Sequence, residues 1–195
     1  MGDGLPNLTN ALYVWNNQLF AGGYYFSEGL EGIAQWSGSN WVSVGGGIGV
    51  INDEYVMNFA TYQDKLVVVG DFSQAGNIAA NDVALWNGVT WQALGSGTNG
   101  VVYAAAEYQG NLVITGSFTE AGGRECSTIA RWDGNEWQPM GSGLTGAISG
   151  VLAGRALAVN GDELIVGGMS FKGGPYESPH IARYLKPLNR PVGVR

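Results

Sequence analysis

Cysteine and histidine are almost absent from this sequence, and their absence limits the chemistry it can support. Cys126 and His180 are the single representatives of their types among 195 residues. A lone cysteine excludes an intrachain disulfide framework. Zinc sites draw on clusters of cysteine and histidine, and these two residues fall in different parts of the chain. We therefore expect neither a metal ion nor another cofactor.

Charged residues are also scarce, at 13% of the chain, against about 25% in an average domain. The balance is acidic, since 16 Asp and Glu face 9 Lys and Arg, for a net charge of −7. An acidic chain repels phosphate groups, which argues against nucleic acid as a partner. No apolar run approaches the ~20 residues that cross a bilayer, so we expect no membrane insertion. Residues 1–30 lack the basic start and continuous apolar stretch of a signal peptide.

Glycine, by contrast, is abundant at 33 residues, and it helps to mark four internal repeats. Each repeat has a leucine that opens a strand-like segment ending in glycine, and spacings of 47, 46 and 52 residues separate Leu19, Leu66, Leu112 and Leu164. Each repeat also has an Ala-x-aromatic motif, which ends at Trp36, Trp86, Trp132 and Tyr184. A period of about 50 residues is typical of propeller blades.

The third repeat shows how each repeat divides into four short strands. Apolar and β-branched segments alternate there with polar turns, and Asp133-Gly134 is a strong hairpin signal. The four segments are residues 102–108, 111–118, 128–132 and 136–140. One extra residue before Phe26 and before Phe171 predicts a β-bulge in the first and fourth repeats. No segment has a sustained apolar period of about 3.6 residues, so we predict an all-β chain without helices.

Four antiparallel strands repeated four times predict a β-propeller made of four-stranded antiparallel blades. We expect one domain over residues 1–195, with a proline-containing tail at 187–195 and blades at residues 9–45, 55–95, 101–141 and 153–186. Six tryptophans are expected to pack between blades: Trp36, Trp86, Trp132, Trp41, Trp91 and Trp137. Four strand-end glycines are expected where backbones approach closely near the central axis: Gly23, Gly70, Gly116 and Gly168.

The fourth repeat is expected to lack its outer strand. Asn189 stands where the other repeats have a second tryptophan, and Pro187 and Pro191 flank it; proline is poorly tolerated inside a strand. Three arrangements remain open: a piece of a longer propeller, a closed four-bladed ring, and half a ring completed by a second copy. In an open arrangement the outermost faces, around residues 13–41 and 157–184, would be apolar and would need a partner.

The repeats resemble those of kelch-like propellers, including the central domain type of galactose oxidase. Secreted bacterial and fungal surface proteins carry the pattern L-x-V-G-G-x-F-x-x-A-G-G followed by I-A-x-W-D-G-x-x-W, which residues 112–123 and 129–137 approach here. The resemblance covers residues 8–186 and implies the fold, whereas propellers host enzymes, lectins and scaffolds alike. The chain departs from the pattern in its glycine pair, which survives only at Gly22-Gly23 and Gly167-Gly168.

Variable loops on a rigid scaffold are where recognition concentrates. The loop between the second and third strands differs among the repeats, and it supplies the candidate partner- or ligand-binding residues Asn77, Asn81, Asp82, Glu120, Arg124, Glu125, Lys172, Tyr176, Glu177 and His180. We identify no catalytic or metal-ligating set. Glu120 and Glu177 fall in equivalent loops of neighbouring repeats and are the acid pair to consider for glycoside hydrolysis.

The hypothesis we favour is a non-catalytic propeller that scaffolds contacts with a protein partner or a second copy. It would be part of a secreted or cell-surface protein or of a larger assembly, since a weakly charged, acidic surface suits an extracellular location. The alternative is a carbohydrate-binding propeller, although a lectin should repeat one polar constellation in every blade and these loops do not. A third hypothesis is an enzyme with a site at the central channel, which the lack of clustered acids, bases and metal ligands argues against.

Overall fold

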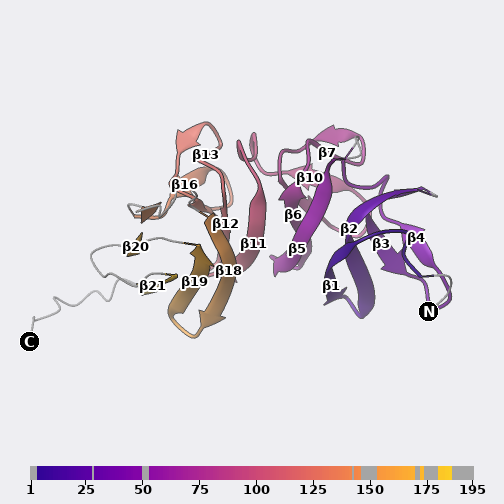
Figure 1. Ribbon diagram of the computed structural model, residues 1–195, viewed down its shortest axis with the longest axis horizontal. Coiled ribbons are helices and arrows are strands. Elements are labelled where there is room, and N and C mark those ends of the chain that lie inside the picture. The colour runs from indigo at the N-terminus through magenta and orange to yellow at the C-terminus, as the bar shows by residue number, and fades with distance from the viewer. Residues whose placement is uncertain are drawn as a thin grey trace, which may run out of the picture.

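The computed structural model describes residues 4–27, 29–49, 53–141, 143–145, 153–169, 172–173 and 180–185. All regular secondary structure within these residues is β-strand, so the all-β prediction is confirmed for this part of the chain. Four antiparallel sheets follow one another along the sequence, and we number them sheet 1 to sheet 4. Figure 1 shows them side by side, with sheet 1 at one end of the row and sheet 4 at the other.

Sheets 1 to 3 have four strands each, and sheet 4 has three within the described residues. Sheet 1 consists of β1 (Thr9–Trp15), β2 (Gln18–Ser27), β3 (Leu30–Trp36) and β4 (Trp41–Ser43). Sheet 2 consists of β5 (Tyr55–Tyr62), β6 (Lys65–Asp71), β9 (Val83–Trp86) and β10 (Trp91–Ala93). Sheet 3 consists of β11 (Val102–Tyr108), β12 (Asn111–Gly116), β15 (Ile129–Trp132) and β16 (Trp137–Pro139). Sheet 4 consists of β18 (Ala153–Asn160), β19 (Glu163–Met169) and β21 (Ile181–Leu185).

Strand order in each sheet is chain order, and short turns join the first strand to the second. The first turn of sheets 1 and 2 places both central residues at positive φ: Asn16 at 48° with Asn17 at 59°, and Gln63 at 48° with Asp64 at 61°. Turns of this type match the right-handed twist of the strands that they connect. The local sequence therefore fixes the antiparallel pairing of β1 with β2 and of β5 with β6.

The loop between the second and third strands contains more structure than the sequence predicted. In sheets 2 and 3 it forms a small hairpin, built from β7 (Gln74–Ala75) with β8 (Ile78–Ala79), and from β13 (Glu120–Ala121) with β14 (Arg124–Glu125). The linker that leaves one sheet pairs with the loop of the next, as Ile48 does with Ala75 and Thr98 with Ala121. The same contact is made by β17 (Leu144–Thr145) with β20 (Lys172–Gly173). These pairings hold each sheet to its successor.

A register shift near the start of the first strand occurs in all four sheets. The opposing glycines Gly23, Gly70 and Gly116 allow it, because a Cβ on any of them would overlap a carbonyl oxygen of the first strand or of the residue just before it. The predicted close approach of backbones is therefore present at these three glycines, between neighbouring strands of one sheet. The bulge predicted before Phe26 is also present, as a register shift between β2 and β3; Phe171 lies outside the described residues.

Each sheet packs one face against the preceding sheet, and we call this its front face. In sheet 2 the front face presents Phe59, Leu66, Val68, Ala84 and Trp86, all buried. The opposite face, which receives the next sheet, is the back face. In sheet 1 the back face presents Tyr13, Trp15, Phe20 and Ile33, and these residues form one core with the front face of sheet 2.

The same front-to-back packing recurs twice more. Leu112, Ile114 and Trp132 of sheet 3 share a core with Tyr62, Val67 and Leu85 of sheet 2. Leu164 and Val166 of sheet 4 share a core with Tyr108, Val113 and Ile129 of sheet 3. At the rim, Tyr108 donates a hydrogen bond to the carbonyl oxygen of Asp162 over 2.7 Å. Three consecutive cores of one kind therefore hold the four sheets together. The described part of the chain contains no long apolar helix of the kind that crosses a bilayer.

Substitution of Gly70 tests the close approach inside the sheets. Its φ is not in the left-handed region, so Gly70→Ala adds a pure steric conflict with the Tyr55 carbonyl group. We expect the free energy of unfolding to fall by about 2–4 kcal/mol in a denaturant titration of dilute protein. Gly167→Ala is the matched control, since a Cβ there meets nothing nearer than Ala156 at 3.9 Å. Equal effects of the two substitutions would contradict this explanation.

Candidate functional site

The front face of sheet 1 lies at the end of the row of sheets and is uncovered around Leu12 and Val14, whereas Ala21 and Ala34 on the same face are buried in a cluster with Tyr25 and Leu30. Strand register places Leu12 opposite Ala21 and Val14 opposite Leu19, with Trp36 and Trp41 paired further along the same face. Leu12 is 63% exposed and Val14 is 65% exposed, whereas Phe59, the counterpart of Leu12 in sheet 2, is 4% exposed. Contiguous exposed apolar patches are often the places where a folded protein meets a partner, so this face is a candidate contact surface.

Each four-stranded sheet carries a pair of tryptophans in contact, one from its third strand and one from its fourth. The ring centroids are 5.4 Å apart for Trp36 and Trp41 and 5.4 Å apart for Trp132 and Trp137, both edge-to-face. In sheet 3 the Trp137 indole donates a 2.7 Å hydrogen bond to the carbonyl oxygen of Leu94, in sheet 2. Trp137 is 1% exposed, whereas Trp36 and Trp41 are only half-buried.

In sheet 2 the tryptophan pair is covered by the turn that leaves sheet 1. The Trp91 indole donates to the carbonyl oxygen of Gly45 over 3.1 Å. A Cβ on Gly45 would overlap the Trp86 ring, so the turn that leaves sheet 1 needs glycine there. Gly45 also has a φ of 56°, in the left-handed region that glycine tolerates best. The pair Trp36 and Trp41 belongs to a sheet with no described sheet in front of it, and it forms the exposed half of such a contact.

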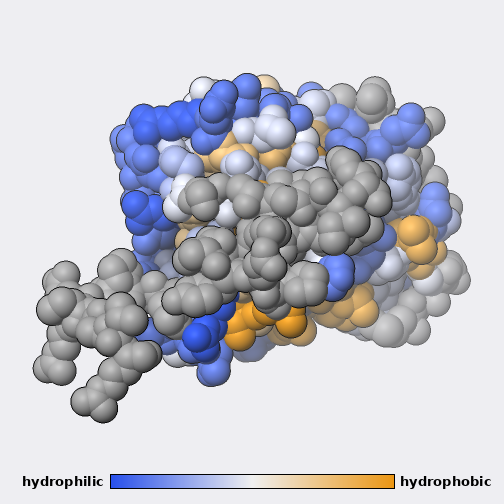
Figure 2. All heavy atoms as spheres, turned by 60° about the vertical axis from the view of Figure 1, so that its left-hand side comes forward, coloured by the Kyte–Doolittle hydropathy of each residue, from blue (hydrophilic) through white to orange (hydrophobic). Residues whose placement is uncertain are grey.

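The back face of sheet 4 is the second uncovered sheet face. Strand register places Ala156, Ala158, Ile165 and Ile181 on it. Ile181 is 56% exposed, and the two alanines are exposed as well. An ion pair between Arg183 and Glu163, 3.1 Å long, lies at one edge of this face. Figure 2 turns the sheet 4 end of the row toward the viewer, and apolar atoms lie along the lower edge of the molecule in this view.

A cavity of about 290 Å³ lies between sheets 3 and 4. Its lining includes Tyr108, Arg131, Met140, Gly141 and Tyr184. Gly141 corresponds to Gly45 and Gly95, which lie against tryptophan rings, but a Cβ on Gly141 would have no atom within 4 Å. The cavity thus lies where the second tryptophan packs in sheets 2 and 3. Asn189, which takes that place in the fourth repeat, is outside the described residues.

Among the predicted loop residues that the structure describes, Asp82 is the one acidic side chain that is buried. It is 6% exposed, and it accepts hydrogen bonds from the Phe72 amide at 3.2 Å and from the Thr98 hydroxyl at 2.9 Å. Burial raises the pKa of Asp82 to about 7, although these two hydrogen bonds oppose the shift. The negative charges of Asp71 and Glu54 raise it further. Asp82 thus helps to join the linker after sheet 2 to that sheet.

The residue directly before the Ile/Val-Ala motif has a positive φ in every repeat, which sequence reasoning missed. The φ angles are 66° at Gly32, 65° at Asp82, 63° at Thr128 and 137° at His180. Glycine and aspartate tolerate this region better than β-branched threonine does. The signal was the position directly before each Ile/Val-Ala motif, where a glycine stands in the first repeat.

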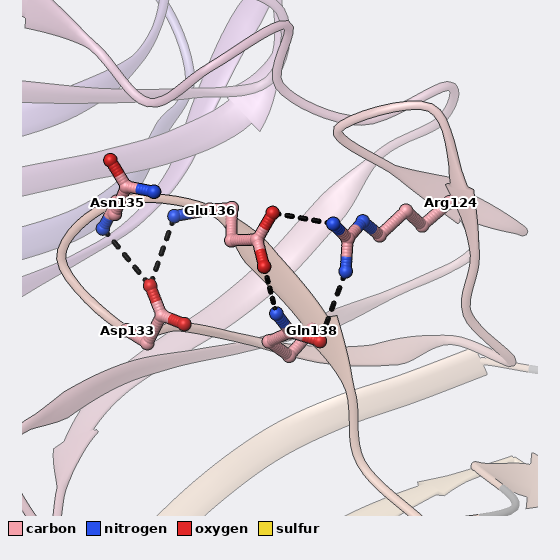
Figure 3. A network of polar contacts seen from close by, with 5 residues as sticks. All are labelled: Arg124, Asp133, Asn135, Glu136 and Gln138. Carbon is pink, nitrogen blue, oxygen red and sulfur yellow. Dashed lines mark hydrogen bonds and ion pairs between the residues drawn. The ribbon is translucent and has the colours of Figure 1, made fainter.

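Three further predicted residues lie on the hairpin of sheet 3, on β13 and β14. Glu120 and Glu125 are opposite each other in register, and both are exposed. Arg124 makes an ion pair with Glu136 and a 3.2 Å hydrogen bond to Gln138, as Figure 3 shows. These contacts tie the hairpin to β16. They leave the two glutamates beside a shallow polar cavity of about 410 Å³.

The other predicted loop residues do not gather into one site. Asn77 lies in the turn between β7 and β8 and is exposed, and Asn81 donates a 2.9 Å hydrogen bond to the Ser96 carbonyl group. Lys172 is described only as part of the backbone of β20, and His180 is exposed directly before β21. Tyr176 and Glu177 lie outside the described residues, so the pairing of Glu120 with Glu177 is not described either.

Residues of the linkers between sheets also form hydrogen bonds with polar groups of these loops. Asn99, between sheets 2 and 3, accepts hydrogen bonds from the amides of Thr119 and Glu120, each 2.9 Å long. Within the described residues, no group of three or more histidine, cysteine, aspartate or glutamate side chains is placed to hold a metal ion. Cys126 is 3% exposed, and burial raises the pKa of its thiol. A buried thiol with a raised pKa is a poor nucleophile.

Comparison with known proteins does not assign the chain to a group. No protein-family model matches it, and no curated protein matches it closely enough to count as a relative.

Replacement of Asp82 by asparagine should change how stability depends on pH. Below the ordinary pKa of 3.8 the Asp82 carboxyl is protonated in both the folded and the unfolded protein, and above about 7 it is ionised in both. Between these values the unfolded protein releases the proton more readily. The buried carboxyl therefore destabilises the folded state increasingly as the pH rises from 3.8 to about 7. We expect this residue to lower the free energy of unfolding by roughly 3–4 kcal/mol across that range. Asp82→Asn should remove this dependence in denaturant titrations. The exposed control Asp133→Asn should keep it; a wild-type profile that is flat would contradict the assignment.

The tryptophan pairs should differ in their contribution to stability. Trp137→Ala opens a cavity between sheets 2 and 3 and removes a buried hydrogen bond, so we expect a loss of about 3–5 kcal/mol. Trp41→Ala, at the equivalent position of sheet 1, should cost less than half as much, because that ring is only half-buried. Thermal and denaturant unfolding measure both. Equal losses would mean that the front face of sheet 1 is covered.

Proposed function

We propose that this chain is a non-catalytic β-propeller scaffold, with kelch-like repeats, that makes protein contacts through the front face of sheet 1. The observation that carries the proposal is the exposure of Leu12, at 63%, because its counterpart in sheet 2, Phe59, is 4% exposed and lies in a buried core. An apolar sheet face that stays in water is costly, and a protein partner removes that cost.

Regular stacking of the sheets supports the propeller part of the proposal. Sheets 1 to 3 have the same strand order, and sheet 4 has its first three strands. Each sheet turns the same face toward its predecessor, and first strands pack near one another, as β1 does with β5 and β11 with β18. Propeller blades are arranged radially in this manner, with their first strands innermost.

A scaffold role fits the chemistry of the loops better than catalysis or sugar binding does. Arg124 and Asn99 are occupied by internal hydrogen bonds, and the loops repeat no shared polar set from sheet to sheet. The polar cavity beside Glu120 and Glu125 has two like charges on paired strands. A secreted or cell-surface protein, or a larger assembly that includes this chain, remains the setting that we propose for the scaffold.

Substitution of Leu12 tests the proposal directly. The charged side chain of Leu12→Lys should abolish the association of the chain that light scattering on a size-exclusion column detects at increasing protein concentration. Val89→Lys is the matched control, because Val89 is 79% exposed but lies in the hairpin turn of sheet 2, away from both uncovered faces. We expect the wild type and Val89→Lys to associate alike. If Leu12→Lys behaves as they do, the front face of sheet 1 is not a contact surface.

A further inference from the structure

We infer that the partner of the sheet 1 front face is the sheet 4 back face of a second copy of this chain. This inference rests on the proposed function, because it names the partner of the same surface. Front-to-back packing occurs three times inside the chain, and each end of the row leaves one half of that contact uncovered. Every copy therefore carries both halves of a fourth contact.

The shape of the sheet 4 back face fits Leu12 in particular. Gly22 is the glycine of sheet 1 that makes room for sheet 2, since a Cβ there would overlap Val56 and would lie 2.7 Å from the Phe59 ring. Gly167 is the equivalent residue of sheet 4, three positions after its repeat leucine. A Cβ on Gly167 meets nothing nearer than 3.9 Å, so the same hollow is open there. Leu12 corresponds to Phe59 and is the side chain that would fill it.

The sizes of the facing residues differ from one internal contact to the next. In the first contact the large Phe59 corresponds in position to a facing Gly22, whereas in the third the large Leu157 faces Thr115. Leu12 opposite Gly167 would repeat the first of these combinations.

Charge and polarity are also compatible with this contact. The described front face of sheet 1 carries no charged side chain over Leu12, Val14, Leu19, Trp36 and Trp41. On the back face of sheet 4, Arg183 is already neutralised by Glu163 at 3.1 Å. In the internal contact, Tyr13 and Thr61 share a 2.9 Å hydrogen bond. In the proposed contact between copies, Ala158 corresponds to Tyr13 and Val14 corresponds to Thr61. An apolar contact would therefore replace this hydrogen bond.

The two copies would meet through different surfaces, which makes the contact heterologous. Such contacts close into a ring when the rotation between copies allows it. Within one chain the two faces do not cover each other, because Leu12 and Ile181 are 63% and 56% exposed. The second copy is therefore the molecule that buries both faces at once.

Mixing two variants distinguishes this contact from any other. Leu12→Lys places a charge on the apolar front face of sheet 1, and Ile181→Lys places a charge on the apolar back face of sheet 4. We expect each variant alone to associate more weakly than the wild type by more than about 30-fold. The equimolar mixture should form a species of twice the 20.5 kDa chain mass, because each variant supplies the intact face that the other lacks. Light scattering and sedimentation velocity measure the masses.

Gly167→Val is a second variant that fills the hollow without adding charge, and it should weaken association as Ile181→Lys does. Near-ultraviolet circular dichroism of each variant shows that the sheets remain packed. If Leu12→Lys loses association while Ile181→Lys and Gly167→Val retain it, the head-to-tail contact is wrong, although the front face of sheet 1 still binds protein. If the mixture stays monomeric, the contact is likewise wrong. If Leu12→Lys also associates normally, the proposed function fails too.

Discussion

Front-to-back packing of one sheet on the next is the interaction on which the rest of this structure depends. A sheet of four short strands cannot bury both apolar faces alone, so its stability comes from its neighbours. The cores that contain Trp86, Trp132 and Leu164 meet this need three times. The same need stays unmet at the two ends of the row. Leu12 and Ile181, on the two outermost faces of the described sheets, are exposed.

Close packing of the sheets places strict demands on a few backbone positions. Gly70 and Gly116 lie against carbonyl oxygens of the first strand or its approach, and Gly45 lies against a tryptophan ring. Other positions accept strain instead: Thr128 is buried, has a φ of 63°, and has a hydroxyl oxygen without a hydrogen-bond partner. Asp82 holds the same conformation and carries a buried carboxylate with a raised pKa. These residues join each linker and loop to the adjoining sheet.

The sequence was most informative where the repeats agree. The Ala-x-aromatic motifs and the leucine spacing predicted all four sheets, because a repeated period constrains every copy at once; the expected absence of a fourth strand in the last sheet falls on residues outside the described part of the chain. The hairpins β7–β8 and β13–β14 were not predicted, since segments of two residues have no measurable apolar period. The loop residues proposed as a site were chosen by their variability, which does not reveal that Asp82 is buried or that Arg124 pairs with Glu136. Uncovered faces at both ends were expected only for an open arrangement of the repeats, one of the alternatives that the sequence left open.

Hydroxyl-radical footprinting at increasing protein concentration tests the central claim most directly, because it measures the solvent exposure of single side chains in the unmodified chain. The account predicts that Leu12 and Ile181 lose reactivity together, with one common midpoint, while Val89 stays fully reactive. Protection of both residues would show that the two end faces are buried in the same contact. Leu12 that remains reactive at every concentration would contradict the account, because the front face of sheet 1 would then bind no second copy.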